Sequence, residues 1–302
     1  MVLGEFNSLH AVSFLTALKI KGESETDLLG ALEVMRSLSR PFPLAERQDP
    51  IVDCCGTGGD GLHTYNISTA CALVLAELGL KVAKHGSRKI SSSCGSADIL
   101  EAFGVAIQSP PENAAINLLN KNFCFLLASD YNQAAQTVQA ARHALQSKTI
   151  FNLLGPLLNP ANPDYQLIGV YSPKPLLTMA KVLKQKKVKG ALVVHGSGFD
   201  EIAVHDKTHG YLLQKGNIMP FHFHPHHVGY PLFPLHDLIS TSKEDNISAF
   251  LELIKGQGKP ALKASVAINA GALLYVAEGT SSIQVGVKKV AQLLETDRVY
   301  QR

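Results

Sequence analysis

The sequence lacks any apolar run close to the roughly 18 residues needed to cross a bilayer, and its first residues, MVLGEFNS, lack the basic and apolar regions of a secretory leader. Its five cysteines are odd in number and include no Cys-x-x-Cys pair, which favours a reducing cytosol. Charged residues make up only 18%, and the net charge of +3 gives no general nucleic-acid or membrane signal. We therefore expect a cytoplasmic protein with no nucleic-acid and no membrane partner.

The apolar content, 46% of 302 residues, is enough for a sizeable core in one large or two modest domains. Residues 9–39 follow a helical period that Gly22 interrupts. From Ile51 onward, apolar strand runs alternate with helical patterns, which predicts an α/β fold with a mostly parallel sheet covered on both faces. We expect a small N-terminal helical domain, a helix that joins it from later in the chain, and a large α/β domain: residues 1–46, a helix within about 130–147, and residues 47–302.

The same patterns assign the remaining segments. Strands are expected at residues 51–55, 80–83, 123–127, 167–171 and 191–194, with a hairpin-rich region at about 200–225. Helices are expected at residues 67–78, 113–120, 131–145, 176–184, 242–253 and 259–277, and a loop with Gly and Pro at 151–161. Because a glycine inside a helix costs about 1 kcal/mol against alanine, Gly271 indicates close packing there.

Two strand–loop–helix units follow each other between residues 51 and 103. The loop of the first is glycine-rich, residues 56–66, and the second unit runs KHGSRKISSSCGSADILEAF over residues 84–103. Two such loops on adjacent strands can surround a polyanion from two sides.

The glycine-rich loop has several interpretations. GTGGDG, residues 56–61, matches G-x-G-x-x-G, but the next strand ends in Lys84 and His85 instead of the acid that a dinucleotide fold requires. It also fails as a Walker A motif, because Leu62 stands where the lysine is needed. The loop is either a cradle of backbone N–H groups for an anion, ahead of a helix start at Ser68, or a tight turn with no ligand.

The second loop favours the anion. Lys84 and Arg88 bring cations beside the same helix starts, and Gly95 lets a backbone approach. Phosphate groups favour such cations together with hydroxyl donors, here Ser91, Ser92, Ser93 and Ser96. The alternative is a solvated serine-rich loop.

Two further clusters could bind metal. Asp200 and Glu201 follow a strand in HGSGFDE, and such a carboxylate pair suits Mg²⁺ shared with phosphates, although an acidic pair in a loop is also common at a surface. The second cluster consists of four histidines, His222, His224, His226 and His227. Because Pro225 interrupts it, exposed histidines at a strand end are favoured over a metal site.

Four motifs in order resemble the anthranilate phosphoribosyltransferase family: GTGGDGLHTYNIST, KHGSRKISSSCGSADILEAFG, FNLLGPLLNPA and HGSGFDEI. The resemblance runs through nearly the whole chain. It implies that the phosphoribosyl group of phosphoribosyl pyrophosphate is transferred to the amine of anthranilate, with Mg²⁺ and release of pyrophosphate, in tryptophan biosynthesis. It also implies a nucleoside phosphorylase-type fold and a homodimer that meets through the helical domain.

The resemblance assigns roles to the residues that match the family's motifs. The donor, phosphoribosyl pyrophosphate, would be bound by Gly56, Gly58, Gly59, Asp60, Thr64, Asn66, Ser68, Thr69, Lys84 and Ser96. Mg²⁺ would be bound by Ser68, Asp200 and Glu201. The path of anthranilate would be lined by His85, Gly86, Ser87, Arg142, Gly155 and Pro156, with Arg142 facing the carboxylate. Among these, Lys84, Asp60 and Arg142 are expected to act in catalysis.

Departures from the family's pattern fall on the acceptor side. Ser87 stands where the family usually has an asparagine that touches anthranilate, so that contact is lost or passes through water. The His-Pro pair that the family often has near Tyr131 and Asn132 is absent. The donor motifs are intact, and the chemistry needs no strong general base, because charge builds on the leaving pyrophosphate and the ribose. His85 is a candidate proton acceptor.

Three other functions are compatible with such a fold. A pyrimidine nucleoside phosphorylase would use inorganic phosphate, and a phosphoribosyltransferase could use another acceptor. A diverged relative could bind nucleic acid without catalysis, but it should show a basic face and a decayed donor site. The intact motifs GTGGD, NIST and FDE and the small net charge favour the transferase.

Overall fold

The computed structural model describes residues 7–44, 49–88 and 94–302. Its centre is a seven-stranded sheet of order β3-β2-β1-β4-β5-β6-β7, in which neighbours from β3 to β5 are parallel and β6 and β7 are antiparallel. The prediction of a mostly parallel sheet is confirmed. The strands are β1 Ile51–Cys54, β2 Lys81–Gly86, β3 Phe123–Leu127, β4 Tyr165–Gly169, β5 Gly190–His195, β6 Thr208–Gln214 and β7 Asn217–Phe223.

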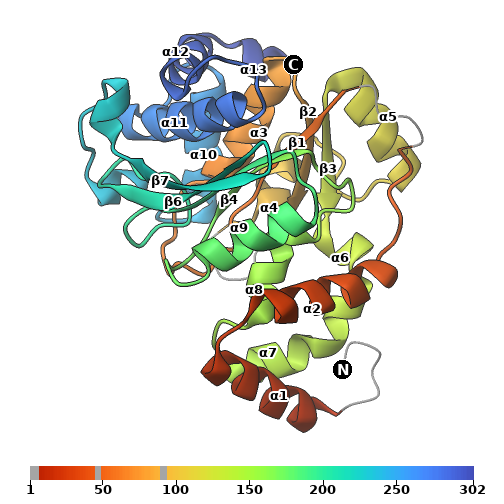
Figure 1. Cartoon of the computed structure of the whole chain (residues 1–302). Coiled ribbons are helices and arrows are strands. Elements are labelled where there is room, and N and C mark those ends of the chain that lie inside the picture. Colours follow the sequence, from red (N-terminus) through yellow and green to blue (C-terminus); the bar gives the residue numbers. More distant parts are fainter. Residues whose placement is uncertain (1–6, 45–48, 89–93) are drawn as a thin grey trace.

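Helices lie on both faces of the sheet and extend beyond one end of it (Figure 1). In the first half of the chain they are α1 Ser8–Lys21, α2 Glu25–Ser37, α3 Ile67–Glu77, α4 Ser96–Ala102, α5 Pro111–Lys121, α6 Ala128–Tyr131, η1 Gln133–Val138 and α7 Gln139–Leu145. In the second half they are α8 Ile150–Leu154, η2 Gly155–Leu157, α9 Leu176–Gln185, η3 Pro225–Val228, η4 Leu235–Leu238, α10 Lys243–Ile254, α11 Pro260–Val276, α12 Ile283–Leu293 and α13 Arg298–Gln301. None of the helices among the described residues is long and apolar enough to cross a membrane.

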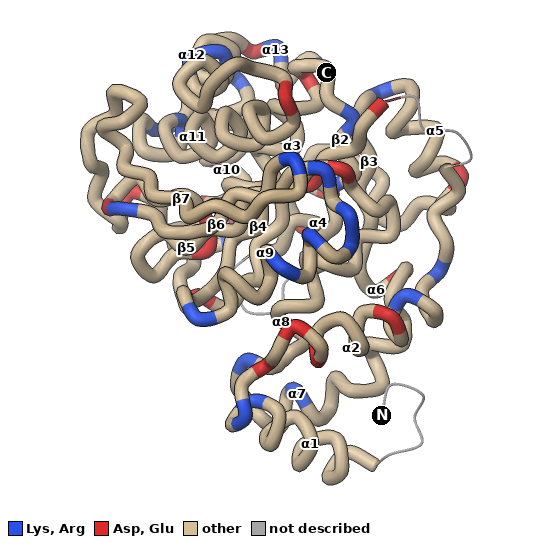
Figure 2. The backbone as a smooth tube through the Cα atoms, viewed as in Figure 1, with Lys and Arg blue, Asp and Glu red and all other residues tan. Residues whose placement is uncertain are grey.

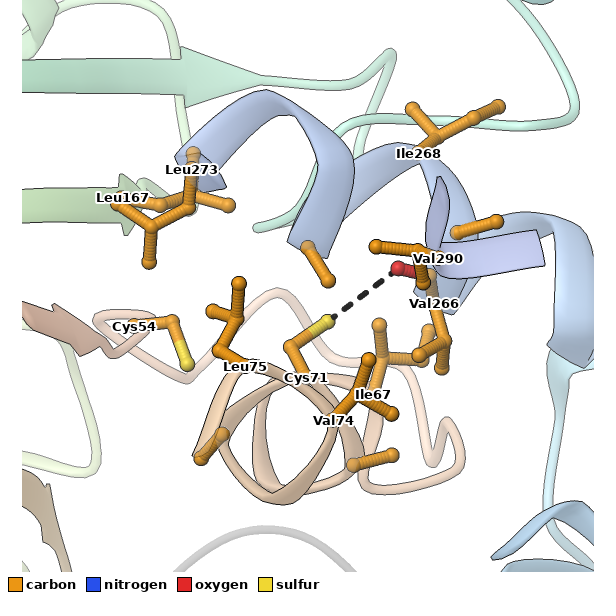
Figure 3. Close-up of a cluster of buried hydrophobic side chains, with 14 of the residues drawn as sticks. Cys54, Ile67, Cys71, Val74, Leu75, Leu167, Val266, Ile268, Leu273 and Val290 are labelled. Carbon is orange, nitrogen blue, oxygen red and sulfur yellow. Dashed lines mark hydrogen bonds between the residues drawn. The ribbon is translucent and has the colours of Figure 1, made fainter. Parts of the chain in front are cut away.

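The strands send alternate side chains to two faces, as the pleat requires. Leu167 on β4 packs toward α3 and α11, whereas its neighbour Ile168 packs on the opposite face toward α9. Figure 3 shows the first face, where Cys71 of α3 lies against α11 and its Sγ donates to the carbonyl oxygen of Val266 at 3.7 Å. Both faces are buried at β4, and the strands β3, FCFLL, and β5, GALVVH, are buried along their whole length, which explains their apolar sequences.

The N-terminal helices form a layer with segments from the middle of the chain. Gly22 ends α1, as predicted, and the side chain of Ser24 caps α2, with Asp27 completing the capping box. Helix α1 packs on α7, and α2 packs on α8 and α9. Figure 1 shows α1, α2 and α7 at the end of the molecule away from the sheet. The division into domains at residue 46 stays a prediction.

Three helix assignments differ from the sequence predictions. The predicted loop at 151–161 was wrong at its start, because Thr149 and Asn152 form a capping box that begins α8, and Pro156 fits at the start of η2. The single helix expected at 131–145 is broken after Asn132. Helix α12 was not predicted from the sequence. A side chain on Gly271 of α11 would overlap the backbone of α12. The close packing predicted at Gly271 is thereby confirmed.

Candidate functional site

The candidate site lies beyond the carboxyl ends of the parallel strands. Strand β1 has its chain neighbour β2 on one side and β4 on the other, so the crossovers run in opposite directions from it. Such a switch point leaves a crevice above the strands, where ligands of open α/β sheets bind. The loops after β1, β2 and β5 all end there, and they line a cavity of about 480 Å³.

The cavity gathers nearly all the site residues that the sequence predicts. Its lining includes Gly56, Gly58, Gly59, Asp60, Thr64, Asn66, Ser68, His85, Gly86, Ser87, Ser96, Arg142, Gly155, Pro156, Asp200 and Glu201. Thr69 and Lys84 are not part of that lining, because both are buried beneath it. Ser91, Ser92 and Ser93 lie outside the described residues. We call the side with the loop after β1, Lys84 and Asp200–Glu201 the donor wall, and the side with His85, Ser87, Arg142 and Gly155 the acceptor wall.

The glycine-rich loop bends around an acid that lies far along the chain. Gly58, Gly59 and Gly61 have φ values of +63°, +79° and +84°, a region that residues with a side chain rarely adopt. The N–H of Gly58 donates to Asp200 Oδ2 at 2.7 Å, and a side chain on Gly56 would collide with the same carboxylate. The glycines are thus needed for curvature and for close approach.

The N-terminus of α3 faces this loop. Asn66 at the N-cap makes no side-chain bond to its own helix, so the first N–H groups of α3 depend on partners from elsewhere. The N–H of Ser68 donates to the carboxylate of Glu201. The donor wall therefore combines backbone donors with a helix terminus that favours negative charge.

Lys84 lies below the donor wall and is only 2% exposed. Its Nζ donates to the carbonyl oxygen of Cys54 at 2.5 Å and to Ser68 Oγ at 3.3 Å. Burial opposes the charge, but the neighbouring ionisable groups, Cys55, Cys54 and Asp53 among them, outweigh burial and raise the pKa of Lys84. Lys84 is thus a buried cation beneath the cavity, with Ser68 between it and the cavity surface.

Asp53 is a site residue that the sequence analysis missed. It is fully buried in β1, where its carboxylate accepts from Asn159 Nδ2 at 2.9 Å and from the N–H of His85 at 3.3 Å. Burial raises the pKa of Asp53 to about 6, although the charge of Lys84 opposes the rise. The available signal was an acid inside an otherwise apolar strand, IVDC, since unpaired acids are almost never fully buried.

Three carboxylates meet on the donor wall. Burial, followed by the charge of Asp60, raises the pKa of Asp200 to about 7. Burial, followed by the charge of Asp200, raises the pKa of Glu201 to about 8. Asp60 Oδ2 is buried with no hydrogen-bond partner among the described residues. Acids crowded in this way gain most from a cation placed between them.

These residues fit Mg²⁺ that is shared with a ligand. Within the described ranges no group of three His, Cys, Asp or Glu side chains is arranged to hold a metal ion by itself. Mg²⁺ is commonly held by one or two carboxylates together with substrate phosphates and water, which is the donor set that Asp200 and Glu201 offer. Ser68 Oγ is bonded instead to the ammonium of Lys84. The histidines at residues 222–227 likewise form no metal cluster of that size in the part of the chain that is described.

The acceptor wall holds a histidine in one protonation state. The carbonyl oxygen of Gly155 can only accept, so His85 Nδ1, 3.1 Å away, carries the proton. Nε2 is left to accept from Asn132 Nδ2 at 3.5 Å, and Asn132 is in turn oriented by Ser39 Oγ at 2.6 Å. Burial, reinforced by Lys84, lowers the pKa of His85 to about 4. His85 is therefore neutral at physiological pH.

Arg142 gives the acceptor wall its charge. It lies on α7, and its guanidinium carbon is 5.5 Å from the ring centre of Phe151. No carboxylate forms an ion pair with Arg142 among the residues that the structure describes. An aromatic surface beside an unpaired cation suits a planar carboxylate. Arg88, in contrast, binds Glu101 at 2.7 Å and 2.9 Å.

A second, outer cavity of about 1050 Å³ opens from the same region and shares Gly59 and Arg142 with the first. Lys148, which the sequence analysis missed, lines it with Nζ 4.3 Å from the ring centre of Tyr171. Lys19 and Lys21 of α1 line the same cavity, and Figure 2 shows these Lys positions at this end of the molecule, near α7. The way into the site is therefore positively charged.

Comparison with known proteins places this geometry in a family. The family described as "Glycosyl transferase family, a/b domain" matches residues 48–298. The anthranilate phosphoribosyltransferase of Shewanella baltica is 41% identical over 306 residues, which cover 100% of this chain and 86% of the relative.

Solved structures agree. The anthranilate phosphoribosyltransferase of Thermus thermophilus is 37% identical with a TM-score of 0.92, and the match covers 99% of this chain and 89% of that one. The enzyme of Saccharomyces cerevisiae, in complex with PRPP and Mg, is 25% identical with a TM-score of 0.87, and the match covers 97% and 83%. On this agreement of sequence and fold, the chain belongs to the anthranilate phosphoribosyltransferase family.

Proposed function

We propose that the protein transfers the phosphoribosyl group of phosphoribosyl pyrophosphate to the amine of anthranilate, releasing pyrophosphate, as a step of tryptophan biosynthesis. One observation carries the proposal: a single cavity has an anion-binding wall with buried carboxylates on one side and Arg142 beside Phe151 on the other. The two walls match the two substrates, since one is a polyphosphate and the other an aromatic carboxylate.

The donor wall would promote departure of pyrophosphate. Backbone N–H groups of the glycine-rich loop and the N-terminus of α3 would bind its oxygens, and Lys84 would stabilise the growing negative charge from below. Mg²⁺, held by Asp200 and Glu201 and by the phosphates themselves, would supply further positive charge to the leaving group. Ser96, at the start of α4, completes the donor wall.

The acceptor wall would place the amine. Arg142 would bind the carboxylate of anthranilate, and Gly155 and Pro156 would confine the ring, so that the amine faces the ribose carbon. Because His85 Nδ1 is bonded to the carbonyl oxygen of Gly155 and Nε2 to Asn132 Nδ2, His85 would present a fixed, neutral ring to the acceptor. Placement of the two reactants supplies much of the rate in a transfer whose leaving group is already activated.

A release assay tests the reaction directly. Pyrophosphate release from phosphoribosyl pyrophosphate is measured with Mg²⁺, with and without anthranilate, and with inorganic phosphate as the competing acceptor of a phosphorylase. We expect release that depends on anthranilate and on Mg²⁺. Donor binding without anthranilate-dependent release would contradict the proposed acceptor while leaving the donor wall intact, and other aromatic amines would then be screened.

We further propose that residues 1–46, with the helix formed by α7, act as a small domain through which two copies pair. The apolar side chains of Leu9 and Ile20 on α1 are 74% and 81% exposed, which is costly on a free surface. A homodimer is therefore expected, and light scattering of the variant Leu9→Glu with Ile20→Glu should report monomers. The thiols of Cys54, Cys55, Cys71 and Cys124 are free, which supports a reducing cytoplasm as the location.

A further inference from the structure

The two loops that form the donor wall are each held from behind by one buried asparagine. Asn246 lies in the first turn of α10, and Asn269 lies in the middle of α11, and both side chains are 0% exposed. Neither residue lines the cavity. A buried amide costs free energy unless its donors and acceptor are all bonded, so the partners of these two side chains show what they do.

Asn246 holds the segment that leads into α3. Its Oδ1 accepts from the N–H of Asn66 at 3.3 Å and from Asn66 Nδ2 at 3.2 Å, while its Nδ2 donates to the carbonyl oxygen of Thr64 at 3.2 Å. One side chain therefore binds the backbone on both sides of Tyr65. Asn66 Nδ2 also donates to the carbonyl oxygen of Cys94 at 3.2 Å, so these bonds connect the loop after β1 to the loop after β2.

Asn269 holds the segment that carries the acidic pair. Its Oδ1 accepts from the N–H of Ile202 at 2.8 Å, and its Nδ2 donates to the carbonyl oxygen of the same residue at 3.0 Å. Nδ2 also donates to Ser265 O within α11 at 2.9 Å, which fixes the rotamer. The amide of Asn269 thus bonds both backbone groups of Ile202, as a neighbouring strand would, and Ile202 directly follows Glu201.

We propose that Asn246 and Asn269 are separate positioning residues for the two halves of the donor wall. Asn246 sets the helix N-terminus that receives pyrophosphate, and Asn269 sets the carboxylates that receive Mg²⁺. The proposal rests on the proposed function, because it names the ligand of each half. It goes beyond that function in stating that the binding of phosphate and the demand for metal are set by different residues that touch neither ligand.

The test uses isosteric acids. Asn246→Asp and Asn269→Asp keep size and burial but replace the Nδ2 donor with an oxygen that faces Thr64 O or Ile202 O. Isothermal calorimetry with pyrophosphate and with phosphoribosyl pyrophosphate, each at saturating Mg²⁺, measures the affinity for phosphate. The Mg²⁺ concentration that produces half of the pyrophosphate-induced rise in melting temperature measures the Mg²⁺ requirement.

We expect opposite patterns. Asn246→Asp should weaken pyrophosphate binding about tenfold with little change in the Mg²⁺ requirement. Asn269→Asp should raise the Mg²⁺ requirement about tenfold with a smaller change in pyrophosphate affinity at saturating metal. In steady-state assays the first variant should raise KM for the donor and leave KM for anthranilate unchanged.

Matched controls separate positioning from general destabilisation. Leu253→Ala on α10 and Leu274→Ala on α11 remove buried apolar side chains, 1% and 2% exposed, from the same helices. Both should lower the melting temperature while leaving the two binding readouts unchanged. If the leucine variants shift the readouts as much as the asparagine variants do, or if both asparagine variants shift both readouts alike, the proposal is overturned.

The proposed function can fail separately. If the wild type released pyrophosphate without regard to anthranilate, the acceptor would be wrong, yet calorimetry with pyrophosphate would still distinguish the two asparagines. If the wild type did not bind pyrophosphate with Mg²⁺ at all, both the function and this inference would be rejected.

Discussion

The donor wall and the acceptor wall of the cavity are built by different means. The donor wall consists of loops fixed by hydrogen bonds to distant parts of the chain, such as the bond of Gly58 to Asp200 and the buried bond of Ile202 to Asn269. The acceptor wall depends on individual side chains, and its cation Arg142, on the short helix α7, lies against the ring of Phe151 on α8. A polyphosphate demands a fixed array of donors, whereas a small aromatic acid can be held by a few side chains. We therefore expect a single substitution at the acceptor wall to affect one substrate, and a displaced loop at the donor wall to affect the reaction as a whole.

Removing the acidic pair should have the largest effect. Asp200→Asn with Glu201→Gln leaves the fold intact but removes the two charges offered to Mg²⁺, so we expect kcat/KM to fall about 1000-fold. The measurement is the rate as a function of Mg²⁺ concentration. An unchanged Mg²⁺ dependence would remove the pair from the site.

Moving the donor wall without changing its chemistry comes next. A side chain at Gly169, the end of β4, would overlap the backbone of Asp200, so Gly169→Ala must displace the acidic loop. Displacement of catalytic groups by about 1 Å costs on the order of 100-fold in rate. Gly30→Ala on α2 is the matched control, because no atom lies within 4 Å of its added carbon, and it should leave kcat/KM unchanged.

The acceptor wall should respond in a different parameter. Arg142→Ala removes a charge-assisted contact, typically about 1.5–3 kcal/mol, so KM for anthranilate should rise roughly 10- to 100-fold. KM for phosphoribosyl pyrophosphate should stay within about twofold of the wild type. Equal increases in both constants would indicate a folding defect instead.

Ser87→Asn sharpens the contrast by adding a group. Ser87 lines the cavity, and an amide there can reach a ligand that the shorter hydroxyl misses. One net hydrogen bond is worth about 0.5–1.5 kcal/mol, so KM for anthranilate should fall about 2- to 10-fold. A rise in that constant would show that the wall is already filled.

The smallest expected effect concerns the protonation state of His85. Because its pKa is lowered to about 4, its ring should not titrate in an NMR experiment between pH 8 and pH 5. The unfolded chain binds a proton below about pH 6.5 and the folded one does not, so folding stability should fall by on the order of 3 kcal/mol as the pH drops from about 6.5 to 4. A His85 resonance that titrates near pH 6.5 would contradict the assignment.

The sequence allowed prediction of what local pattern encodes. Glycines at positions 56–61 and the pair at 200–201 stand beside strands whose ends must meet, so the donor wall followed from topology. The asparagines at 132, 159, 246 and 269 could not be found in this way, because each bonds to a segment many residues away and no periodicity marks it. Asp53 differs from these asparagines, because a lone acid in a buried strand is visible in the sequence, although it was missed.

Translation order gives the asparagine contacts another consequence. Asn246 emerges from the ribosome 180 residues after Asn66, its partner. At about 5–20 residues per second, the phosphate loop on a growing chain waits roughly 9–36 s for that partner. During this interval the sheet strands β1 to β5 can already pair, but the loop above them has no fixed shape to bind a polyphosphate. The nascent protein can therefore pair these strands before it acquires the contacts that shape the loop for its substrate.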